Sequence, residues 1–290
     1  MHPLIGPFSD PSFTVPGLGL ELHAFGVLVA TGFVLGGNLA QAKAVKFGGS
    51  PDGINRLIGW LVLGVFVGGH WGHLLMYKPG DVAGDGQRFL TMLRVFSQGR
   101  IPHGDEVPVT LQFWHGLSSF GGFFVCVALT IWFFRKERLP FWPNADAIAY
   151  GLTVGWFFGR MGCFSAHDHA GTPTDFWLGV YGMCPGNNPT IACHDLGLYE
   201  AIWSISMFGL FTLLDRKVRP SGFYTGLLAL MYGPYRFFSD FYRPVETDTR
   251  YLGLTPAQYG SILFTLLGLW IVRTRFARAA VQAEASPPSA

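Results

Sequence analysis

The sequence predicts an all-α integral membrane protein with about seven transmembrane helices and a small outward-facing head and arm region. Half of the 290 residues are hydrophobic and only 13% are charged, whereas soluble proteins carry roughly a quarter charged residues. The mean hydropathy is +0.33. The apolar residues form runs of about 20, the length that a helix needs to cross a bilayer. These runs are continuously apolar rather than alternating, which excludes a closed β-barrel.

The seven expected spans lie near residues 19–40, 54–77, 111–134, 145–166, 198–214, 222–242 and 256–272. We expect residues 1–275 to form one seven-helix membrane domain. Its two long outer connections, 78–110 and 167–197, are predicted to form arm or head elements. In the first connection, MLRVFSQGRIPHG indicates a short amphipathic helix at the level of the head groups. Residues 276–290 are predicted to be a disordered cytoplasmic tail.

The distribution of positive charge predicts the orientation of these spans. Twelve of the 20 Lys and Arg residues follow spans one, three, five and seven in groups of three, and six lie in connections on the other side. The positive-inside rule therefore places the N-terminus outside and the C-terminus in the cytoplasm. Cys184 and Cys193 then lie on the outer side, where an oxidising compartment permits a disulfide. The sequence alone leaves that pairing open.

Two arginines, Arg160 and Arg236, lie inside or at the outer ends of predicted spans. An arginine in a membrane is costly and marks a functional site or an internal ion pair. The structural alternative pairs Arg160 with Asp168, and Arg236 with Asp240 at an (i, i+4) spacing. Two such sites on different helices favour a functional role, because permanent guanidiniums suit the oxygens of a phosphate.

Further polar residues surround the outer ends of the same helices. Span three enters with FWHGLSSFGGFF, and span four ends in GRMGCFSAHDHAG. CHDLGLYEAIW leads into span five, and span six holds YGPYRFFSDFYR. The histidines titrate near neutral pH, so each is a candidate to accept a proton, although single histidines are commonly packing residues. Gly121 and Gly122 are equally compatible with close helix packing.

Two other interpretations of the sequence are a metal site and a retinal-binding protein. The HDH triplet with Cys163 nearby resembles a zinc-ligand cluster, but the spacing lacks the regularity of known structural sites, so no metal is expected. A retinal protein needs a lysine in its last helix for a Schiff base, and no Lys follows Lys217.

Ordered motifs from about Leu20 to about Trp270 resemble the bacterial prolipoprotein diacylglyceryl transferase family. LHAFG and GGHWGHLLMY are similar to its first- and second-helix motifs, and LSSFGG is similar to its Ser-Phe-His-Gly-Gly motif. GRMGCF, with Asp168 and Gly171, resembles its Gly-Arg-x-Gly-Asn-Phe-x-Asn-x-Glu-x-x-Gly signature. HDLGLYE resembles His-Pro-Ser-Gln-Leu-Tyr-Glu, and YGPYRFFSDFYR resembles Tyr-Gly-x-x-Arg-Phe-x-x-Glu-x-x-Arg.

The resemblance implies an enzyme of the bacterial inner membrane. Such an enzyme moves the diacylglyceryl group of phosphatidylglycerol onto the lipobox cysteine of a prelipoprotein and releases glycerol phosphate, without a cofactor. Its partners would be phosphatidylglycerol, the prelipoprotein signal segment and membrane lipids, with no nucleic acid. The candidate catalytic residues are His115, His167, Asp168, His194 and Arg236. The candidate head-group-binding residues are Arg160, Tyr232, Arg236, Asp240, Gly121, Gly122, Gly162 and Gly171.

The chain departs from the family pattern at one position that matters for catalysis. Phe120 replaces the histidine that precedes the Gly-Gly pair. His115 lies five residues upstream, about 140° around a helix and about 7.5 Å along it, so it substitutes only with a local distortion. In exchange the chain has His167 and His169 around Asp168. We therefore expect His167 to carry the histidine chemistry. A relative that binds anionic lipid without transferring it is the alternative.

Overall fold

The computed structural model describes residues 3–8, 11–15, 20–77, 79–112, 119–184, 186, 188–245 and 250–285. The described chain is mostly helical and divides into two compact units. Unit 1 comprises Met1–Ile54 and Trp142–Ala290, and unit 2 comprises Asn55–Phe141.

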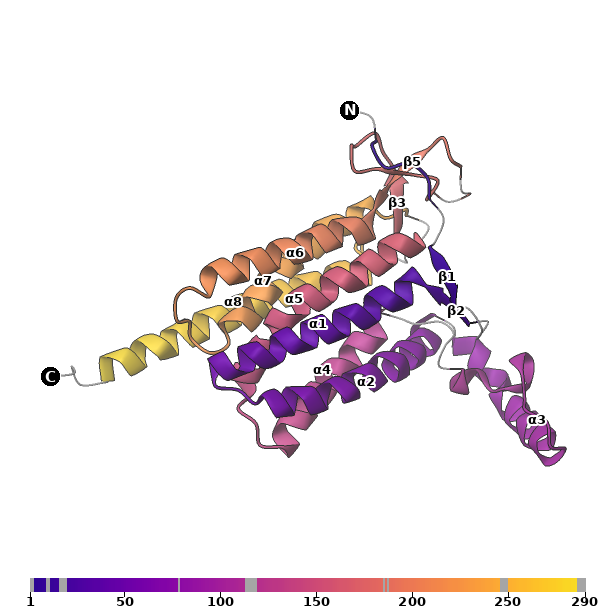
Figure 1. Ribbon diagram of the computed structural model, residues 1–290, viewed down its shortest axis with the longest axis horizontal. Helices are drawn as coiled ribbons and strands as arrows, with labels where there is room; N and C mark the ends of the chain where they lie inside the picture. The colour runs from indigo at the N-terminus through magenta and orange to yellow at the C-terminus, as the bar shows by residue number, and fades with distance from the viewer. Residues whose placement is uncertain are drawn as a thin grey trace. The chain divides into compact units, whose positions relative to one another are not determined.

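Five long helices of unit 1 run side by side (Figure 1). They are α1 (Ala24–Phe47), α5 (Phe141–Ala166), α6 (Leu196–Leu214), α7 (Phe223–Ser239) and α8 (Pro256–Ala285). Glycines allow α1 and α5 to touch backbone to backbone: a Cβ on Gly151 would lie 2.3 Å from the Gly36 carbonyl oxygen. A Cβ on Gly233 of α7 would lie 2.2 Å from Oγ1 of Thr265 on α8. Small residues are the usual means of close packing between membrane helices.

Two predicted boundaries in unit 1 need correction. The first span begins at Ala24 rather than near residue 19, because β2 (Leu20–His23) pairs with β1 (Ser12–Val15) in an antiparallel hairpin. At the other end, α8 continues to Ala285 where a disordered tail was expected. The segment after Phe276 is rich in alanine, which has the highest intrinsic helix propensity and prolongs the preceding helix.

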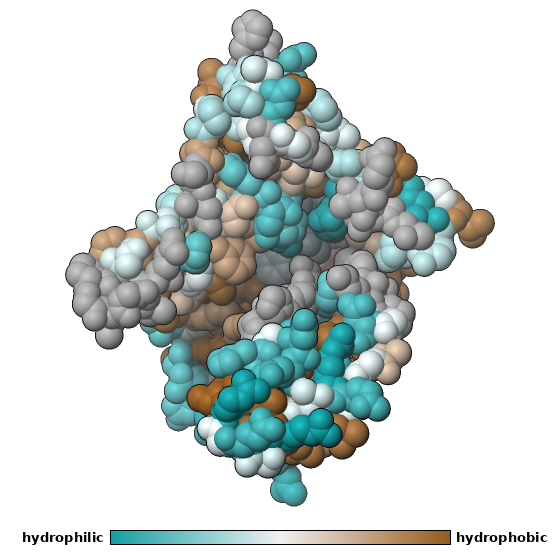
Figure 2. Space-filling view, turned by 90° about the vertical axis from the view of Figure 1, so that its right-hand side faces the viewer, coloured by the Kyte–Doolittle hydropathy of each residue, from teal (hydrophilic) through white to brown (hydrophobic). Residues whose placement is uncertain are grey.

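A small sheet forms a head at one end of unit 1. Its strand order is β3 (Ala170–Pro173), β5 (Ala192–Asp195), β4 (Val180–Tyr181), and both pairings are antiparallel. Ile5 bridges to Val180, which brings the N-terminal segment into the head. The surface of this end, at the top of Figure 2, mixes hydrophilic and hydrophobic residues. The predicted outer connection 167–197 therefore contains an ordered head element.

Cys184 and Cys193 form a disulfide in the head, a pairing that the sequence left open. Both residues are buried together with Val180 and Met183. Replacing both cysteines with alanine should lower the stability of the head by about 2–3 kcal/mol, because the short closed loop gains freedom in the unfolded chain. Limited proteolysis and the melting temperature in detergent measure the effect. Cys126→Ala, which removes a free thiol in unit 2, is the control. Equal melting temperatures of the double variant and this control would contradict the prediction.

The end of unit 1 opposite the head carries basic residues at the helix termini. Nζ of Lys43 lies 2.6 Å and Nζ of Lys46 lies 2.9 Å from Oδ2 of Asp215. Nε of Arg275 donates to the Ser221 carbonyl. Figure 1 places the C-terminal end of α8 on this side and the N-terminal segment at the head.

Unit 2 consists of most of α2 together with an arm and α4. Its elements are α2 (Pro51–Tyr77), η1 (Pro79–Gly84), α3 (Asp85–Ser97), η2 (Gly104–Glu106), η3 (Val109–Leu111) and α4 (Ser119–Lys136). The amphipathic arm helix was expected near residues 92–104, but α3 begins at Asp85. The carboxylate of Asp85 accepts hydrogen bonds from the backbone N–H groups of Val109 and Thr110, both at 2.8 Å. These bonds hold the start of α3 against the returning chain.

Four helices of the described chain are long and apolar enough to cross a membrane. They are the segments Ala24–Phe47, Pro51–Leu75, Leu196–Leu214 and Pro256–Val281. The predicted spans near 111–134, 145–166 and 222–242 also coincide with helices, namely α4, α5 and α7. The structure is therefore that of a helical membrane protein.

Candidate functional site

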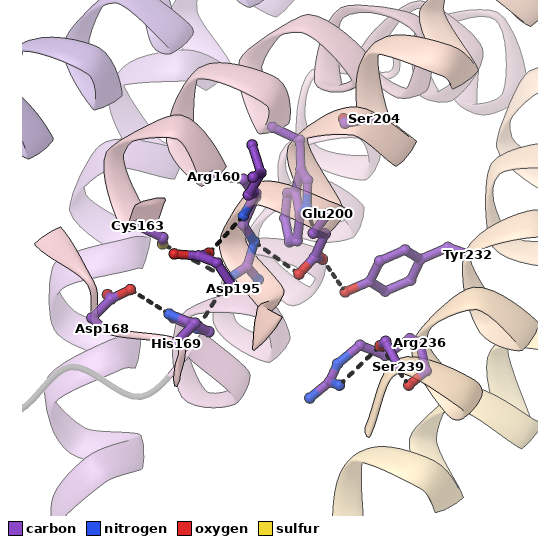
Figure 3. A network of polar contacts seen from close by, with 12 residues as sticks. Arg160, Cys163, Asp168, His169, Asp195, Glu200, Ser204, Tyr232, Arg236 and Ser239 are labelled. Atoms are coloured by element: carbon purple, nitrogen blue, oxygen red, sulfur yellow. Dashed lines mark hydrogen bonds and ion pairs between the residues drawn. The ribbon is translucent and has the colours of Figure 1, made fainter. Parts of the chain in front are cut away.

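The centre of the site is an ion pair between α5 and α6 near the head. Nε of Arg160 lies 3.0 Å from Oε2 of Glu200, and both side chains are largely buried. Oε1 of Glu200 accepts hydrogen bonds from the Tyr232 hydroxyl at 2.7 Å and from the Trp156 indole at 2.9 Å. Figure 3 shows these side chains converging from three helices. Arg160 thus pairs with Glu200, whereas Asp168, the partner considered from sequence, binds elsewhere.

Arg236 lies on α7, one helical turn after Tyr232. Its Nη1 lies 2.7 Å from Oδ1 of Asp240, the (i, i+4) pair expected from the sequence. Asp240 is fully buried and also accepts a hydrogen bond from the Thr255 hydroxyl. Nε of Arg243 lies 3.3 Å from the same carboxylate. Asp240 is therefore held by buried contacts with Thr255 and Arg243, and a carboxylate held in this way fixes the position of Arg236.

Arg160 and Arg236 belong to one polar region. Figure 3 shows the Arg236 and Tyr232 side chains extending from α7 on the same side, toward the region of Glu200. In the described part of the chain, the side-chain contacts of Arg160 use Nε and Nη1, and those of Arg236 use Nη1. Nη2 of each guanidinium takes no part in these contacts.

The turn after α5 brings a histidine to Arg160. Nη1 of Arg160 lies 3.0 Å from Nε2 of His169, and the other ring nitrogen, Nδ1, is hydrogen-bonded to Oδ1 of Asp168. Nη1 also lies 3.8 Å from Sγ of Cys163. His169 was absent from the residues selected by sequence, although it lies in the HDH triplet.

One group of ligand atoms in this turn is compact enough to hold a metal ion. Atoms of Cys163, Asp168 and His169 lie within 4.8 Å of one another. However, the permanently charged guanidinium of Arg160 points at both the sulfur and the imidazole. A cation would meet this charge, and a zinc site needs three or four converging ligands with no such competitor. We therefore infer that this cluster binds the guanidinium of Arg160 rather than a metal ion.

His167, the expected base, contacts Phe8 and Asp195. Its Nε2 lies 3.0 Å from the Phe8 carbonyl oxygen, and its ring packs against the Phe8 ring at 4.2 Å. Its Nδ1 lies 3.9 Å from Oδ2 of Asp195. These contacts join the N-terminal segment to the base of the head, so the catalytic role of His167 stays a prediction from sequence.

His194, on β5, lies in an aromatic environment. Its Nδ1 is hydrogen-bonded to the Tyr199 hydroxyl at 2.7 Å, and the Tyr242 ring lies 4.5 Å away. Burial lowers the pKa of His194 below its usual value, which favours the neutral ring. His115 lies outside the described residues.

The selected glycines lie at close contacts between elements. A Cβ on Gly121 of α4 would lie 2.2 Å from the Gly68 carbonyl oxygen of α2. A Cβ on Gly171 would lie 2.9 Å from Cβ of His194, where β3 and β5 approach each other. Gly162 faces the Phe25 ring and Gly122 faces the backbone of α2. These contacts support the packing interpretation of the glycines.

Because the carboxyl of Asp195 is buried, we expect the free energy of unfolding to depend on pH. Burial raises the pKa of this carboxyl to about 7, while its Oδ1 caps α6 by accepting the Leu198 N–H at 2.8 Å. The folded state therefore holds a proton that the unfolded chain releases near pH 4, so the contribution of Asp195 to stability is fully present below pH 4 and is lost as the pH rises to 7. Asp195→Asn keeps the cap without the charge. At pH 8 it should be more stable than the wild type, by about 2–4 kcal/mol.

Melting temperatures at pH 5 and pH 8 in detergent measure this effect. The exposed carboxylate Asp105 offers the matched control Asp105→Asn, which should follow the wild type at both values. If Asp195→Asn loses as much stability as the wild type between pH 5 and pH 8, the prediction fails.

Several site residues were missed by the selection from sequence. Glu200 and Tyr199 stand in the HDLGLYE motif, and Trp156 lies one turn before Arg160. Tyr235 contributes a buried hydroxyl without a partner among the described residues. An acidic residue inside an apolar span, such as Glu200, was the signal available from sequence.

Comparisons with known proteins agree on one family. Residues 13–274 match the family model described as prolipoprotein diacylglyceryl transferase. The chain is 31% identical over 266 residues to the phosphatidylglycerol–prolipoprotein diacylglyceryl transferase of Solidesulfovibrio magneticus, an alignment that covers 88% of this chain and 91% of that protein. It is 30% identical over 252 residues to the protein of the same name from Chromohalobacter salexigens, which covers 86% and 85% of the two chains. The chain therefore belongs to the prolipoprotein diacylglyceryl transferase family.

Proposed function

We propose that this protein transfers the diacylglyceryl group of phosphatidylglycerol to the lipobox cysteine of prelipoproteins, the first step of bacterial lipoprotein maturation. A thioether forms and glycerol phosphate is released. The observation that carries the proposal is the pair of buried arginines, Arg160 and Arg236, that face one region near the head. Curated relatives that share most of the chain are named for this reaction.

The geometry supports binding of the phosphate group. The guanidiniums of Arg160, Arg236 and Arg243 lie beside the carboxylates of Glu200 and Asp240. A phosphodiester carries one negative charge, and the two Nη2 groups can donate to its oxygens. The positive charge of the guanidiniums would also stabilise the departing glycerol phosphate in the transition state. In this arrangement Asp240 positions Arg236, and Tyr232 positions Arg160 through Glu200.

We also propose that α4, α5 and α7 complete a set of seven spans, with the head outside a bacterial inner membrane. The basic residues Lys43, Lys46 and Arg275 lie at the end of unit 1 opposite the head, as the positive-inside rule requires of a cytoplasmic face. The disulfide in the head fits an oxidising outer compartment. This orientation presents the arginine pair to the outer leaflet and to an exported lipobox segment.

Purified protein, phosphatidylglycerol and a lipobox peptide test the proposal directly. Mass spectrometry should detect a peptide heavier by one diacylglyceryl group, with glycerol phosphate as the co-product. Complementation of a strain depleted of its own transferase provides the cellular readout.

A non-catalytic lipid-binding role is the second candidate, favoured by Phe120 in place of the family histidine. Binding of phosphatidylglycerol by a folded protein, with neither product formed, would support that candidate instead.

A further inference from the structure

The end of α5 positions the residues after it by a specific turn. His167 adopts a left-handed conformation with φ 51°, and the Asp168 N–H bonds to the Cys163 carbonyl at 3.4 Å. The His167 N–H bonds to the Phe164 carbonyl at 3.3 Å. This is the hydrogen-bond pattern of a Schellman motif, in which a left-handed residue reverses the chain over the helix end. The reversal returns Asp168 and His169 to the side of the helix that carries Arg160.

The contacts of His169 define which ring nitrogen carries its proton. A guanidinium has only donors, so Nε2, which lies 3.0 Å from Nη1 of Arg160, must act as an acceptor. Nδ1 then carries the hydrogen and donates it to Oδ1 of Asp168. A carboxylate that fixes the tautomer in this way leaves the opposite nitrogen as a base.

The position of this nitrogen distinguishes His169 from the other described histidines near the head. His167 contacts the Phe8 carbonyl, and His194 contacts Tyr199. Only the His169 ring, among these three, touches an arginine of the proposed phosphate site. Its side chain is 18% exposed, so a substrate group can reach it, while Asp168 lies further outward.

We propose that His169, oriented by Asp168, is the general base that deprotonates the acceptor thiol. This inference rests on the proposed function. The guanidinium stays on Glu200 and binds the lipid phosphate through Nη2, while Nε2 of His169 leaves its contact with Nη1 and takes the S–H proton. The sulfur forms a C–S bond to the glyceryl carbon, and the C–O bond to phosphorus-bound oxygen breaks with its electron pair left on that oxygen. The proton passes from His169 to the departing glycerol phosphate, so charge and atoms balance.

Four variants test the assignment in the transfer assay with phosphatidylglycerol and a lipobox peptide. His169→Ala should lower kcat by about 10²–10⁴-fold with little change in KM for the lipid. The wild-type rate should rise with pH along an acid limb that ends once the base is deprotonated. The residual rate of His169→Ala should lose this end point and rise steadily with pH, because hydroxide then supplies the thiolate. Added imidazole should restore part of the rate. Asp168→Asn should lower kcat by about tenfold or more, since the amide favours the wrong tautomer.

His167→Asn and His103→Ala complete the set. Asparagine tolerates the left-handed conformation of residue 167, so the turn is kept while the ring is lost. His103, in the arm of unit 2, is exposed and serves as the histidine control, with wild-type kinetics expected.

The transfer reaction and the role of His169 as its base are tested by different outcomes. Wild-type protein that binds lipid but forms no thioether refutes the proposed function itself. An active wild type with an unchanged acid limb in His169→Ala refutes only the assignment of the base. Loss of the end point of the acid limb in His167→Asn, with its retention in His169→Ala, would assign the role to the neighbouring histidine instead.

Discussion

Arg160→Ala and Arg236→Ala are each expected to lower kcat/KM for diacylglyceryl transfer by about 10²–10³-fold or more. Each guanidinium is held by a buried carboxylate, so it is already oriented before substrate binds and needs no reorganisation as charge develops on the leaving phosphate. The rate of thioether formation, measured with phosphatidylglycerol vesicles and a lipobox peptide, gives the effect.

Lysine variants and a distant arginine make this test specific. Arg160→Lys and Arg236→Lys keep the charge but lose the fork of donors, so we expect a partial loss. Arg275→Ala, which removes an arginine at the opposite end of unit 1, is the matched control and should transfer at the wild-type rate. Wild-type activity in either alanine variant would remove that arginine from the mechanism.

Glu200→Gln is expected to destabilise the fold by about 3–5 kcal/mol. The amide keeps the acceptor for Tyr232 and Trp156 but leaves the buried guanidinium of Arg160 without its opposite charge. Breaking one side of a buried ion pair costs this much because the remaining charge stays desolvated. Unfolding in detergent, followed by the melting temperature, measures the loss.

The double variant Arg160→Met/Glu200→Gln should recover most of that stability while remaining inactive, since neither buried charge is left. The exposed pair of Arg100 and Glu106 offers a control, Glu106→Gln, for which a change of at most about 1 kcal/mol is expected. A double variant no more stable than Glu200→Gln would show that the unpaired charge of Arg160 does not cause the loss of stability in Glu200→Gln.

The positions of the helices were predictable because each apolar run must satisfy its own backbone hydrogen bonds in lipid. Every predicted span coincides with a helix, and the errors lie at the ends, where local pairing such as the β1–β2 hairpin decides. The Arg236–Asp240 pair was also predictable, because both residues lie on one helical face. The disulfide was compatible with the sequence, but its formation depends on how the head folds.

Contacts between distant segments were not predictable in this way. Arg160 and Glu200 belong to different helices, and only the packing of α5 against α6 makes them partners. Likewise, His167 and His169 flank the same aspartate, so the sequence alone does not distinguish their roles. The reversal at residue 167 sends the first ring to the Phe8 carbonyl and the second to Arg160.

The sequence by itself determined the class of the protein, the positions of its apolar helices and the two arginines whose charge is costly in an apolar environment. These follow from transfer energies of single residues and from the period of one helix. The tertiary structure alone decided which carboxylate neutralises each guanidinium and which histidine reaches them. Those choices depend on distances between side chains that are remote along the chain, and such distances exist only once the helices and the head have packed.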